Sequence, residues 1–248
     1  MNAMVQTHVC TGILVKPGLV VAPASCVTKG IKDQEKFPLV RLGSYDLNTH
    51  DGPEEPEVLK TCQRIVHHKF TGKPEEGNDI ALLVLNGTKW QHAPIEGMLP
   101  VDHCVPNKTM SSLGWFATSR HGSPSYNLVA IPKLKHVEKG ECVKALKDKG
   151  VPNGTVCAVP EFRAVAEWDL GSPLLCQDEH LIGLVSYAQP QPNVHVPYVY
   201  THVSEYENWI NTLGKDASTV RDNPDSEYCR KDPEVPTAGD SATTREEL

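Results

Sequence analysis

The sequence predicts an all-β protein, and three observations lead to that prediction. Short runs rich in Val, Ile, Leu and Tyr alternate with turn signals from residue 8 to about residue 203. The 20 Pro and 18 Gly residues suit many short strands joined by tight turns. The length of 248 residues fits one all-β unit, because barrels and sandwiches often run to about 200–250 residues. An apolar fraction of 39% and a charged fraction of 22% allow a sizeable core, which excludes wholesale disorder, collagen and coiled coils.

Seven strands are predicted, each bounded by Pro, Gly, Asn or Asp residues that favour turns. They span residues 13–15, 19–22, 39–42, 64–67, 80–85, 181–187 and 198–203. The best apolar run, residues 80–85, is far shorter than the roughly 20 residues that a membrane-spanning helix needs. No membrane span is therefore expected.

Two helices are predicted among the strands. Residues 139–149 form an amphipathic segment with Val143 and Leu146 on one face, and Gly150 is expected to end it. Residues 204–213 begin with Ser and Glu in capping-box spacing and carry an apolar face that includes Trp209. Gly214 is expected to stop this second helix.

The composition changes after residue 214, so the sequence predicts a folded domain over 1–214 and a tail over 215–248. The tail holds nine acidic and five basic residues, a net charge of −4, and almost no aromatic residues. Such a segment is expected to be disordered and chiefly solubilising. Cys229 is its one unusual residue.

Charge and histidine placement exclude several function classes. A net charge of −7 without any basic tract argues against nucleic acids and anionic membrane surfaces as partners. The histidines show no metal-ligand spacing, and the adjacent pair His67 and His68 is interpreted as a surface feature. No metal and no cofactor is expected.

The cysteines and glycosylation motifs favour a secreted protein. Eight dispersed cysteines form an even set, which leaves disulfides or buried thiols as alternatives. Three Asn-x-Thr motifs begin at Asn86, Asn107 and Asn153 and are candidate glycosylation sites. Residues 1–10 lack the charged and apolar regions of a signal peptide, so either the chain is unusual or its true start lies upstream.

Five segments, in order and at matching separations, resemble the trypsin-like serine protease family. They are CTGILV followed by VAPASC (10–26), NDIALL (78–83), LGWF (113–116), WDLGSPLLC (168–176) and the closing stretch from VSY to NWI (185–210). A further segment, VRLGSYD (40–46), is similar to the arthropod clip-type branch. The resemblance implies two antiparallel β-barrels, about 1–108 and 109–203, with a first strand missing and a C-terminal helix over 204–213.

The resemblance also implies that the catalytic triad is degenerate. Ser25 stands where the family has the histidine base, and a hydroxyl cannot accept a proton near neutral pH. Leu170 stands at the nucleophile position, and only the aspartate is retained, as Asp79. Asp79 is expected to accept hydrogen bonds from Ser25 or nearby backbone. Ser172, two residues further along the chain, is the alternative nucleophile, but its side chain is expected to point away from the cleft.

Four more positions depart from what an active family member needs. Trp168 replaces a glycine of the oxyanion loop, and Ala164 replaces the acidic base of the specificity pocket. Tyr198 replaces a wall glycine and is expected to fill the pocket. Asp169, the partner of the new N-terminus in activated proteases of the family, has no Ile-Val-Gly-Gly segment upstream of Cys10 to pair with.

The resemblance implies two disulfides, Cys10–Cys26 and Cys142–Cys157. Cys104–Cys229 is a third predicted pair, which would tie the tail to the linker between the barrels. Cys176 is expected to lack its family partner, because Met110 occupies that place. The pocket disulfide is expected to be absent because Ala166 stands at its first position, and the pairing of Cys62 and of Cys176 is left open.

A secreted, catalytically dead serine protease homolog that acts by binding extracellular proteins is the function these features imply. In the clip-type branch such homologs serve as cofactors or decoys in extracellular proteolytic cascades of immunity. Alternatives are an inhibitor or sequestering protein for a secreted enzyme or ligand, a truncated gene copy, and an active hydrolase with rearranged chemistry.

Overall fold

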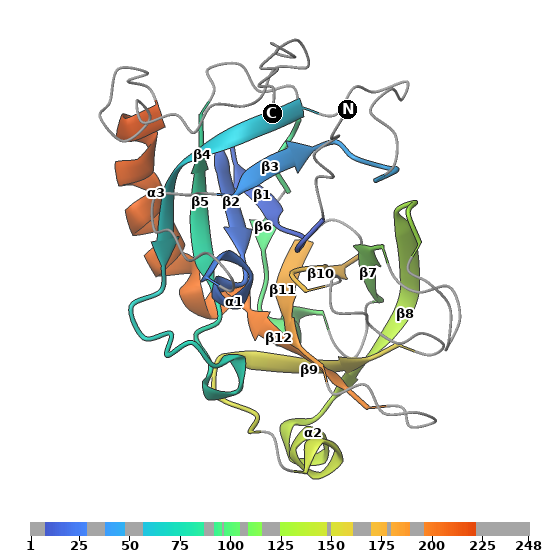
Figure 1. The fold of residues 1–248 in the computed structure, drawn as a ribbon. Coiled ribbons are helices and arrows are strands. Elements are labelled where there is room, and N and C mark those ends of the chain that lie inside the picture. The colour runs from blue at the N-terminus through green and yellow to red at the C-terminus, as the bar shows by residue number, and fades with distance from the viewer. Residues whose placement is uncertain are drawn as a thin grey trace, which may run out of the picture.

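The strands form two β-sheets, as predicted (Figure 1). The computed structural model describes residues 8–28, 38–47, 57–86, 92–95, 97–104, 109–115, 125–147, 150–160, 170–177, 180–188 and 196–221, with side chains up to 214. All seven predicted strands are present within these residues.

The first sheet has five strands in the order β1-β2-β5-β4-β3. Their bounds are β1 Ile13–Lys16, β2 Leu19–Ala22, β3 Leu39–Leu42, β4 Glu57–Val66 and β5 Ala81–Leu85. Every neighbouring pair is antiparallel. β2 and β5 are buried along their whole length, which explains why their sequences are continuous apolar runs rather than alternating ones.

The second sheet has seven strands and closes on itself, because β10 pairs with both β7 and β11. Its strands are β6 Gly97–Met98, β7 Met110–Gly114, β8 Val129–Val137, β9 Thr155–Val159, β10 Pro173–Cys176, β11 His180–Tyr187 and β12 Tyr198–His202. Closure leaves few exposed strand edges, which is how β-barrels avoid edge-to-edge association. β6 lies within the range predicted for the first barrel but pairs in parallel with β11.

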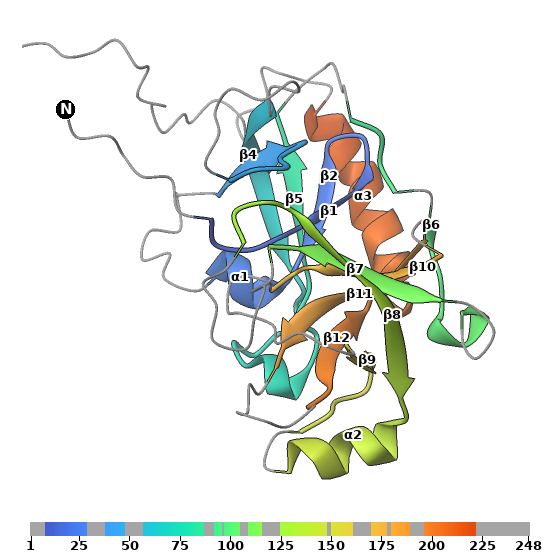
Figure 2. The same ribbon diagram turned by 90° about the vertical axis from the view of Figure 1, so that its right-hand side faces the viewer.

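Three α-helices and three 3-10 turns accompany the sheets within the described residues (Figures 1 and 2). They are α1 Ala24–Thr28, α2 Lys139–Leu146 and α3 Glu207–Arg221, with 3-10 turns at Pro74–Glu76, Val101–His103 and Val203–Tyr206. α3 lies along the first sheet although it follows the last strand of the second. No helix among the described residues is long and apolar enough to span a membrane.

The prediction that Gly214 ends the C-terminal helix was wrong, because α3 continues through it to Arg221. A Cβ atom on this glycine would lie 2.9 Å from Leu19 Cδ2, so Gly214 allows close packing of the helix on β2. The N-terminal capping box was also wrong, since the Ser204 hydroxyl contacts His202 Nε2 at 3.0 Å and the helix begins at Glu207. Residues 215–221 therefore belong to the helix and not to the tail.

The predicted buried face of α2 was confirmed at Leu146 but wrong at Val143. Cys142 and Leu146, four residues apart, are the buried positions, whereas Val143 is 44% exposed. The disulfide of Cys142 fixes which side of the helix faces the sheet, and Lys147, with a φ of 47°, ends the helix before Gly150.

β8 escaped prediction because Pro132 interrupts its sequence, and proline cannot donate to a strand ladder. The structure places Pro132 in a register irregularity: Ile131 pairs with Ser112, and the next pair joins Leu134 to Met110. Lys133, at a φ of 60°, completes this bulge. Beyond it β8 leaves β7 and pairs with β9.

Candidate functional site

The predicted triad positions lie where the two sheets meet. Ser25 is in α1, immediately after β2, and Asp79 comes two residues before β5. Leu170 precedes β10 of the second sheet and packs against the core clusters of both sheets. Ser186 in β11 joins them, since its hydroxyl reaches Asp79 across the junction. The sequence analysis did not single out Ser186.

Asp79 is the centre of a buried hydrogen-bond network. Its side chain is only 1% exposed. Its Oδ1 accepts the backbone N–H of Ser25 at 2.7 Å, and its Oδ2 accepts the Ser25 hydroxyl at 2.9 Å. The same Oδ2 accepts the Ser186 hydroxyl at 2.5 Å, and the Asp79 carbonyl accepts the Thr201 hydroxyl at 2.9 Å. Asp79 thus accepts the hydrogen bonds expected from Ser25, and its carboxylate accepts a further one from the Ser186 hydroxyl.

Burial raises the pKa of the Asp79 carboxyl above its ordinary value, because desolvation disfavours the charged form. The hydrogen bonds from Ser186, from the backbone and hydroxyl of Ser25, and from the backbone at Ala24 oppose this effect and lower the pKa. The donors that surround the carboxylate thus replace part of the solvation it loses. An imidazole would present a further donor and a site for the proton, whereas Ser25 supplies only a hydroxyl.

The segment that carries Leu170 is held tightly against the first sheet. The Thr11 N–H donates to the Leu170 carbonyl at 2.9 Å, and the Gly171 N–H donates to the Val185 carbonyl at 2.8 Å. Gly171 has a φ of 83°, and a Cβ atom there would lie 1.8 Å from the Thr11 carbonyl oxygen. Only glycine fits this position, so the path of the chain next to Leu170 is fixed.

Ser172 and Tyr198 are both buried. Ser172 is 0% exposed, and its hydroxyl has no hydrogen-bond partner among the described residues. It therefore lies inside the protein, away from any bound substrate. Tyr198 is 6% exposed and belongs to the core cluster of the second sheet. Whether its ring also fills a specificity pocket stays a prediction, because Ala164, the other predicted pocket residue, falls outside the described residues.

Several other predicted positions fall outside the described residues. They are Ala164, Ala166, Trp168, Asp169, Asn107 and Cys229. The other two candidate glycosylation sites, Asn86 and Asn153, have exposed side chains. The amide oxygen of Asn153 accepts a hydrogen bond from Lys139 Nζ at 2.6 Å.

Three disulfides are formed among the described cysteines. Cys10 pairs with Cys26 and Cys142 with Cys157, the two pairs that the family resemblance implies. Loops of this length contribute about 3 kcal/mol each by chain closure. The third disulfide joins Cys104 to Cys176.

The predicted pair Cys104–Cys229 was therefore wrong, and Cys104 is instead the partner of Cys176, whose pairing was left open. Met110 does lie directly opposite Cys176 in the β7–β10 register. The partner comes instead from the end of the 3-10 turn Val101–His103, where the Cys104 N–H donates to the Val101 carbonyl at 2.9 Å. A search along the strand register alone misses a cysteine that reaches in from a turn.

His67 was wrongly interpreted as a surface residue. It is 7% exposed, and its ring centroid lies 5.2 Å from that of Tyr206 and 5.0 Å from that of Trp209, both in edge-on geometry. Burial lowers the pKa of His67, and the charges of His68 and Lys69 lower it further. His68 is exposed, as predicted.

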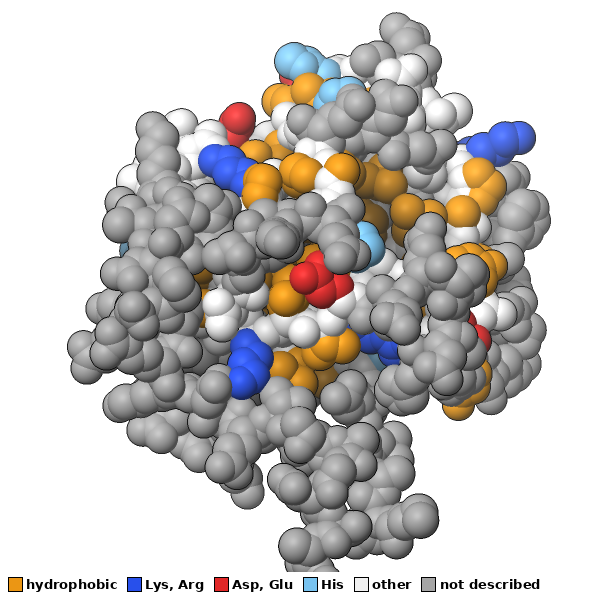
Figure 3. All heavy atoms as spheres, turned by 90° about the horizontal axis from the view of Figure 1, so that it is seen from above, with side chains coloured by type: hydrophobic (Ala, Val, Ile, Leu, Met, Phe, Trp, Pro, Cys, Tyr) orange, Lys and Arg blue, Asp and Glu red, His pale blue; other side chains and the backbone are white. Residues whose placement is uncertain are grey.

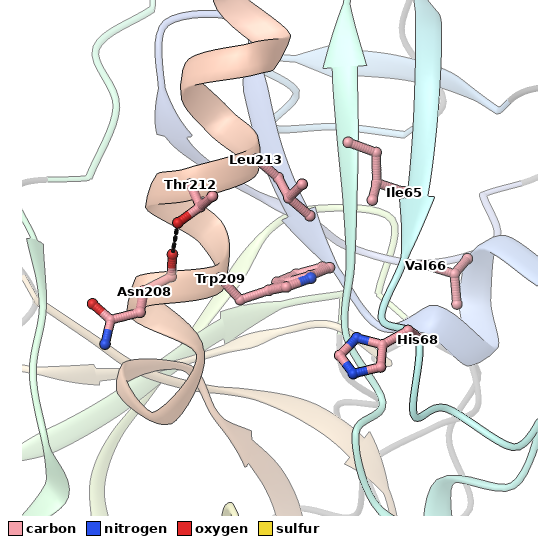
Figure 4. A pocket seen from close by; sticks show the side chains of 7 residues that line it. All are labelled: Ile65, Val66, His68, Asn208, Trp209, Thr212 and Leu213. Carbon is pink, nitrogen blue, oxygen red and sulfur yellow. Dashed lines mark hydrogen bonds between the residues drawn. The ribbon is translucent and has the colours of Figure 1, made fainter.

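An apolar groove of about 510 Å³ lies between α3 and β4 (Figure 4). Its lining residues are Ile65, Val66, His68, Asn208, Trp209, Thr212 and Leu213. None of the predicted triad positions is among them. On the face shown in Figure 3, hydrophobic side chains and charged side chains of both signs are interspersed. The described residues bring together no group of His, Cys, Asp or Glu that could hold a metal ion.

Comparisons with known proteins agree with this architecture. The sequence model of the family described as Trypsin matches residues 2–210. The chain is 32% identical over 220 residues to Kallikrein-15 of Homo sapiens, covering 83% of this chain and 81% of that protein. It is 28% identical over 222 residues to Protein masquerade of Drosophila melanogaster, covering 83% of this chain but 20% of that protein. The solved structure of neuropsin, a serine protease expressed in the limbic system of mouse brain, matches with a TM-score of 0.68 at 26% identity, covering 83% of this chain and 89% of that one.

Proposed function

Since the chain belongs to the trypsin family, we propose that it is a non-catalytic member that acts by binding other extracellular proteins. The observation that carries this proposal is the set of hydrogen bonds that the Asp79 carboxylate accepts. Its carboxylate accepts hydroxyl hydrogen bonds from Ser25 and Ser186. A serine protease needs an imidazole in contact with this carboxylate on one side and with a nucleophilic hydroxyl on the other.

We infer that neither the general base nor the nucleophile is present at the corresponding positions of this chain. Ser25 cannot act as a general base near neutral pH, because a protonated hydroxyl is far too acidic to form. Leu170 offers only a hydrocarbon side chain, which packs between the two core clusters. The one nearby serine of the same segment, Ser172, is fully buried. The site thus supports a structural junction between the sheets better than it supports acyl transfer.

The three disulfides support an extracellular location, because such bonds persist in oxidising compartments. We place the protein's partners there as well. A cofactor or decoy role in an extracellular proteolytic cascade, including one of immunity, fits a protease fold that binds without cleaving. The partners would then be the proteases of the cascade or their substrates.

Two exposed tyrosines mark a surface suited to such binding. Tyr45 is 66% exposed and Tyr126 is 58% exposed. They flank a short antiparallel bridge between Asp46 and Asn127, in which the Leu47 N–H donates to the Tyr126 carbonyl. This register makes the two tyrosines diagonal neighbours on one face, about 7–8 Å apart. Exposed tyrosines held on rigid backbone are frequent energetic centres of protein interfaces.

Catalytic inactivity is tested directly with the intact purified protein. We expect no uptake of a fluorophosphonate probe and no hydrolysis of small ester or peptide substrates, with an active trypsin assayed in parallel as the control. Mass spectrometry of the intact protein would give the stoichiometry of labelling. Stoichiometric modification of any serine would overturn the proposal.

Binding is tested by the Tyr45→Ala/Tyr126→Ala double variant. The wild-type protein is expected to retain a protease or protease substrate from the native extracellular fluid, and the double variant to bind the same protein at least tenfold more weakly. Val143→Ala, which truncates an exposed apolar residue of α2, is the matched control and should bind as the wild type does. Loss of the partner protease's activity in the complex would favour the inhibitor alternative over the cofactor or decoy role.

A further inference from the structure

Cys62 is a disulfide-bonded cysteine that none of the three described disulfides includes. It is 4% exposed and lies in β4. No described cysteine is free, and Cys62 itself is bonded. The other six described cysteines are paired among themselves as Cys10–Cys26, Cys104–Cys176 and Cys142–Cys157.

We propose that the partner of Cys62 is Cys229, so that a fourth disulfide ties the C-terminal segment beyond α3 to β4. The chain has eight cysteines, and Cys229 is the one that the described pairs leave over. The pair replaces the predicted Cys104–Cys229 bond and moves the attachment of the tail from the region between the barrels to the first sheet.

The position of Cys62 in β4 suits a covalent anchor. Residues 57–60 of β4 pair with β3, and residues 61–66 pair with β5. The β4–β5 register shifts between Thr61 and Gln63, so Cys62 occupies a bulge at the point where β4 passes from one neighbour to the other. A bulged residue is released from the regular ladder, which lets its side chain be re-aimed toward a partner outside the sheet.

The end of α3 lies within reach of this point. Leu213 of α3 and Ile65 of β4 line the same groove (Figure 4), and both ribbon views show the C-terminal end of α3 beside β4 (Figures 1 and 2). Ile65 is three strand residues from Cys62, about 10 Å. Arg221 is eight helical residues beyond Leu213, about 12 Å. The seven residues from 222 to 228 can extend to about 25 Å, which exceeds either of these two displacements.

The proposed disulfide would attach the chain that follows the C-terminus of α3. α3 is held along the first sheet by apolar contacts, whereas a Cys62–Cys229 bond would also connect the chain after Arg221 covalently to β4. Reduction of that bond would free the segment after α3 without breaking any strand pairing.

Peptide mapping without reduction tests the proposal on the full protein. Free thiols are first blocked with an alkylating reagent, and the unfolded protein is then digested with trypsin. Cleavage after Lys60 and Arg64 yields the peptide TCQR, and cleavage after Arg221 and Arg230 yields DNPDSEYCR. We expect these two peptides to be linked as one species whose mass resolves into the two separate peptides on reduction.

Two variants make the test decisive whatever the yield of the linked peptide. Cys229→Ser should expose one new alkylatable thiol in the unfolded protein, at Cys62, and Cys62→Ser should expose one at Cys229. Cys104→Ser is the matched control and should expose Cys176 instead. Linkage of Cys62 to any other cysteine, alkylation of Cys62 in the wild-type protein, or a covalent dimer of twice the chain mass before reduction would each overturn the assignment.

Discussion

At the residue scale, Asp79 shows how a buried carboxylate is held by serine hydroxyls and a backbone N–H. A buried charge is tolerated only where hydrogen bonds replace its hydration. Ser25 in α1 donates two of these hydrogen bonds, one from its backbone N–H to Asp79 Oδ1 and one from its hydroxyl to Asp79 Oδ2. Ser186 donates from the second sheet. The carboxylate therefore links a helix of the first half of the chain to a strand of the second.

Removal of the Asp79 carboxylate should destabilise the protein strongly. Asp79→Ala leaves the Ser25 N–H, the Ser25 hydroxyl and the Ser186 hydroxyl without their acceptor in a buried site. Each unsatisfied donor costs about 1–3 kcal/mol, so we expect the free energy of unfolding to fall by about 3 kcal/mol or more. Ser25→Ala, which removes one donor and leaves the acceptor bonded, should cost about 1 kcal/mol. Denaturant unfolding followed by circular dichroism measures both.

Asp102→Ala is the control for this pair of variants. Asp102 is an exposed aspartate in the 3-10 turn Val101–His103, so its truncation should change the stability by no more than about 0.5 kcal/mol. An Asp79→Ala protein as stable as Asp102→Ala would mean that the hydrogen bonds of Asp79 contribute nothing to the junction between the sheets.

At the scale of elements, α3 joins the two halves of the molecule. Ile210 and Leu213 pack in a cluster that takes Leu82 from the first sheet and Leu184 from the second. Trp209 and the preceding Tyr206 complete the contact by meeting His67 at the end of β4 edge-on. The helix therefore packs against a histidine whose neutral form is favoured by burial.

This arrangement predicts a loss of stability on acidification. The pKa of His67 in the folded protein is lowered, first by burial and then by the charges of His68 and Lys69. The unfolded chain takes up the proton at about pH 6.5, whereas the folded protein resists it. The contribution of His67 is therefore fully present above about pH 6.5 and is lost as the pH falls through the lowered folded pKa. His67→Phe, which keeps an aromatic ring, should lose less stability between pH 7 and pH 5 than the wild type.

His202 requires a control, because burial lowers its pKa in the same direction. Both the wild type and His67→Phe retain His202, so the difference between their free energies of unfolding isolates His67. His103→Phe replaces an exposed histidine and should follow the wild-type pH profile. Identical profiles for His67→Phe and the wild type would contradict the assigned role of His67.

At the scale of the whole molecule, seven of the described strands were predicted from the sequence, whereas β6, β7, β8, β9 and β10 were not. The buried runs of β2 and β5 are recognisable because they are continuous and apolar. β8 was not, since its Pro132 is accommodated by a bulge that only the pairing with β7 creates. The end of α3 was missed for a similar reason: Gly214 serves tight packing on Leu19, not termination. Tertiary contacts decided both cases.

The part of the candidate site that lies in recognisable sequence motifs could be predicted, and the rest could not. The short VAPASC and NDIALL segments place Ser25 and Asp79, and their hydrogen bonds follow from the proximity of the two residues. Ser186 could not be recognised, because its role depends on β11 crossing the junction between the sheets. Cys104–Cys176 was missed because the bond starts from a turn and not from the strand opposite.

Restoration of activity is a property of the whole molecule, because it requires residues from both sheets to act together. Ser25→His alone or Leu170→Ser alone should give no measurable turnover, since triad residues act as a unit. The double variant restores Ser, His and Asp on paper, yet we expect it to stay at background. Trp168 in place of the oxyanion-loop glycine should cost about 10²–10³ in rate. Tyr198 is packed in the core of the second sheet and is expected to leave the substrate side chain without an orienting pocket.

Asp169 is expected to add a third barrier, because it should need the ammonium of a new Ile-Val N-terminus before the segment of Leu170 takes an active form. The expected order follows from these three losses. The double variant is inert, and addition of Trp168→Gly and Tyr198→Gly raises turnover only when an Ile-Val N-terminus is supplied as well. Hydrolysis of small activated esters, which need little binding energy for orientation, measures each step. Robust turnover by the double variant alone would show that oxyanion hole, pocket and loop are already preorganised, and that the losses at positions 25 and 170 are the only ones that matter.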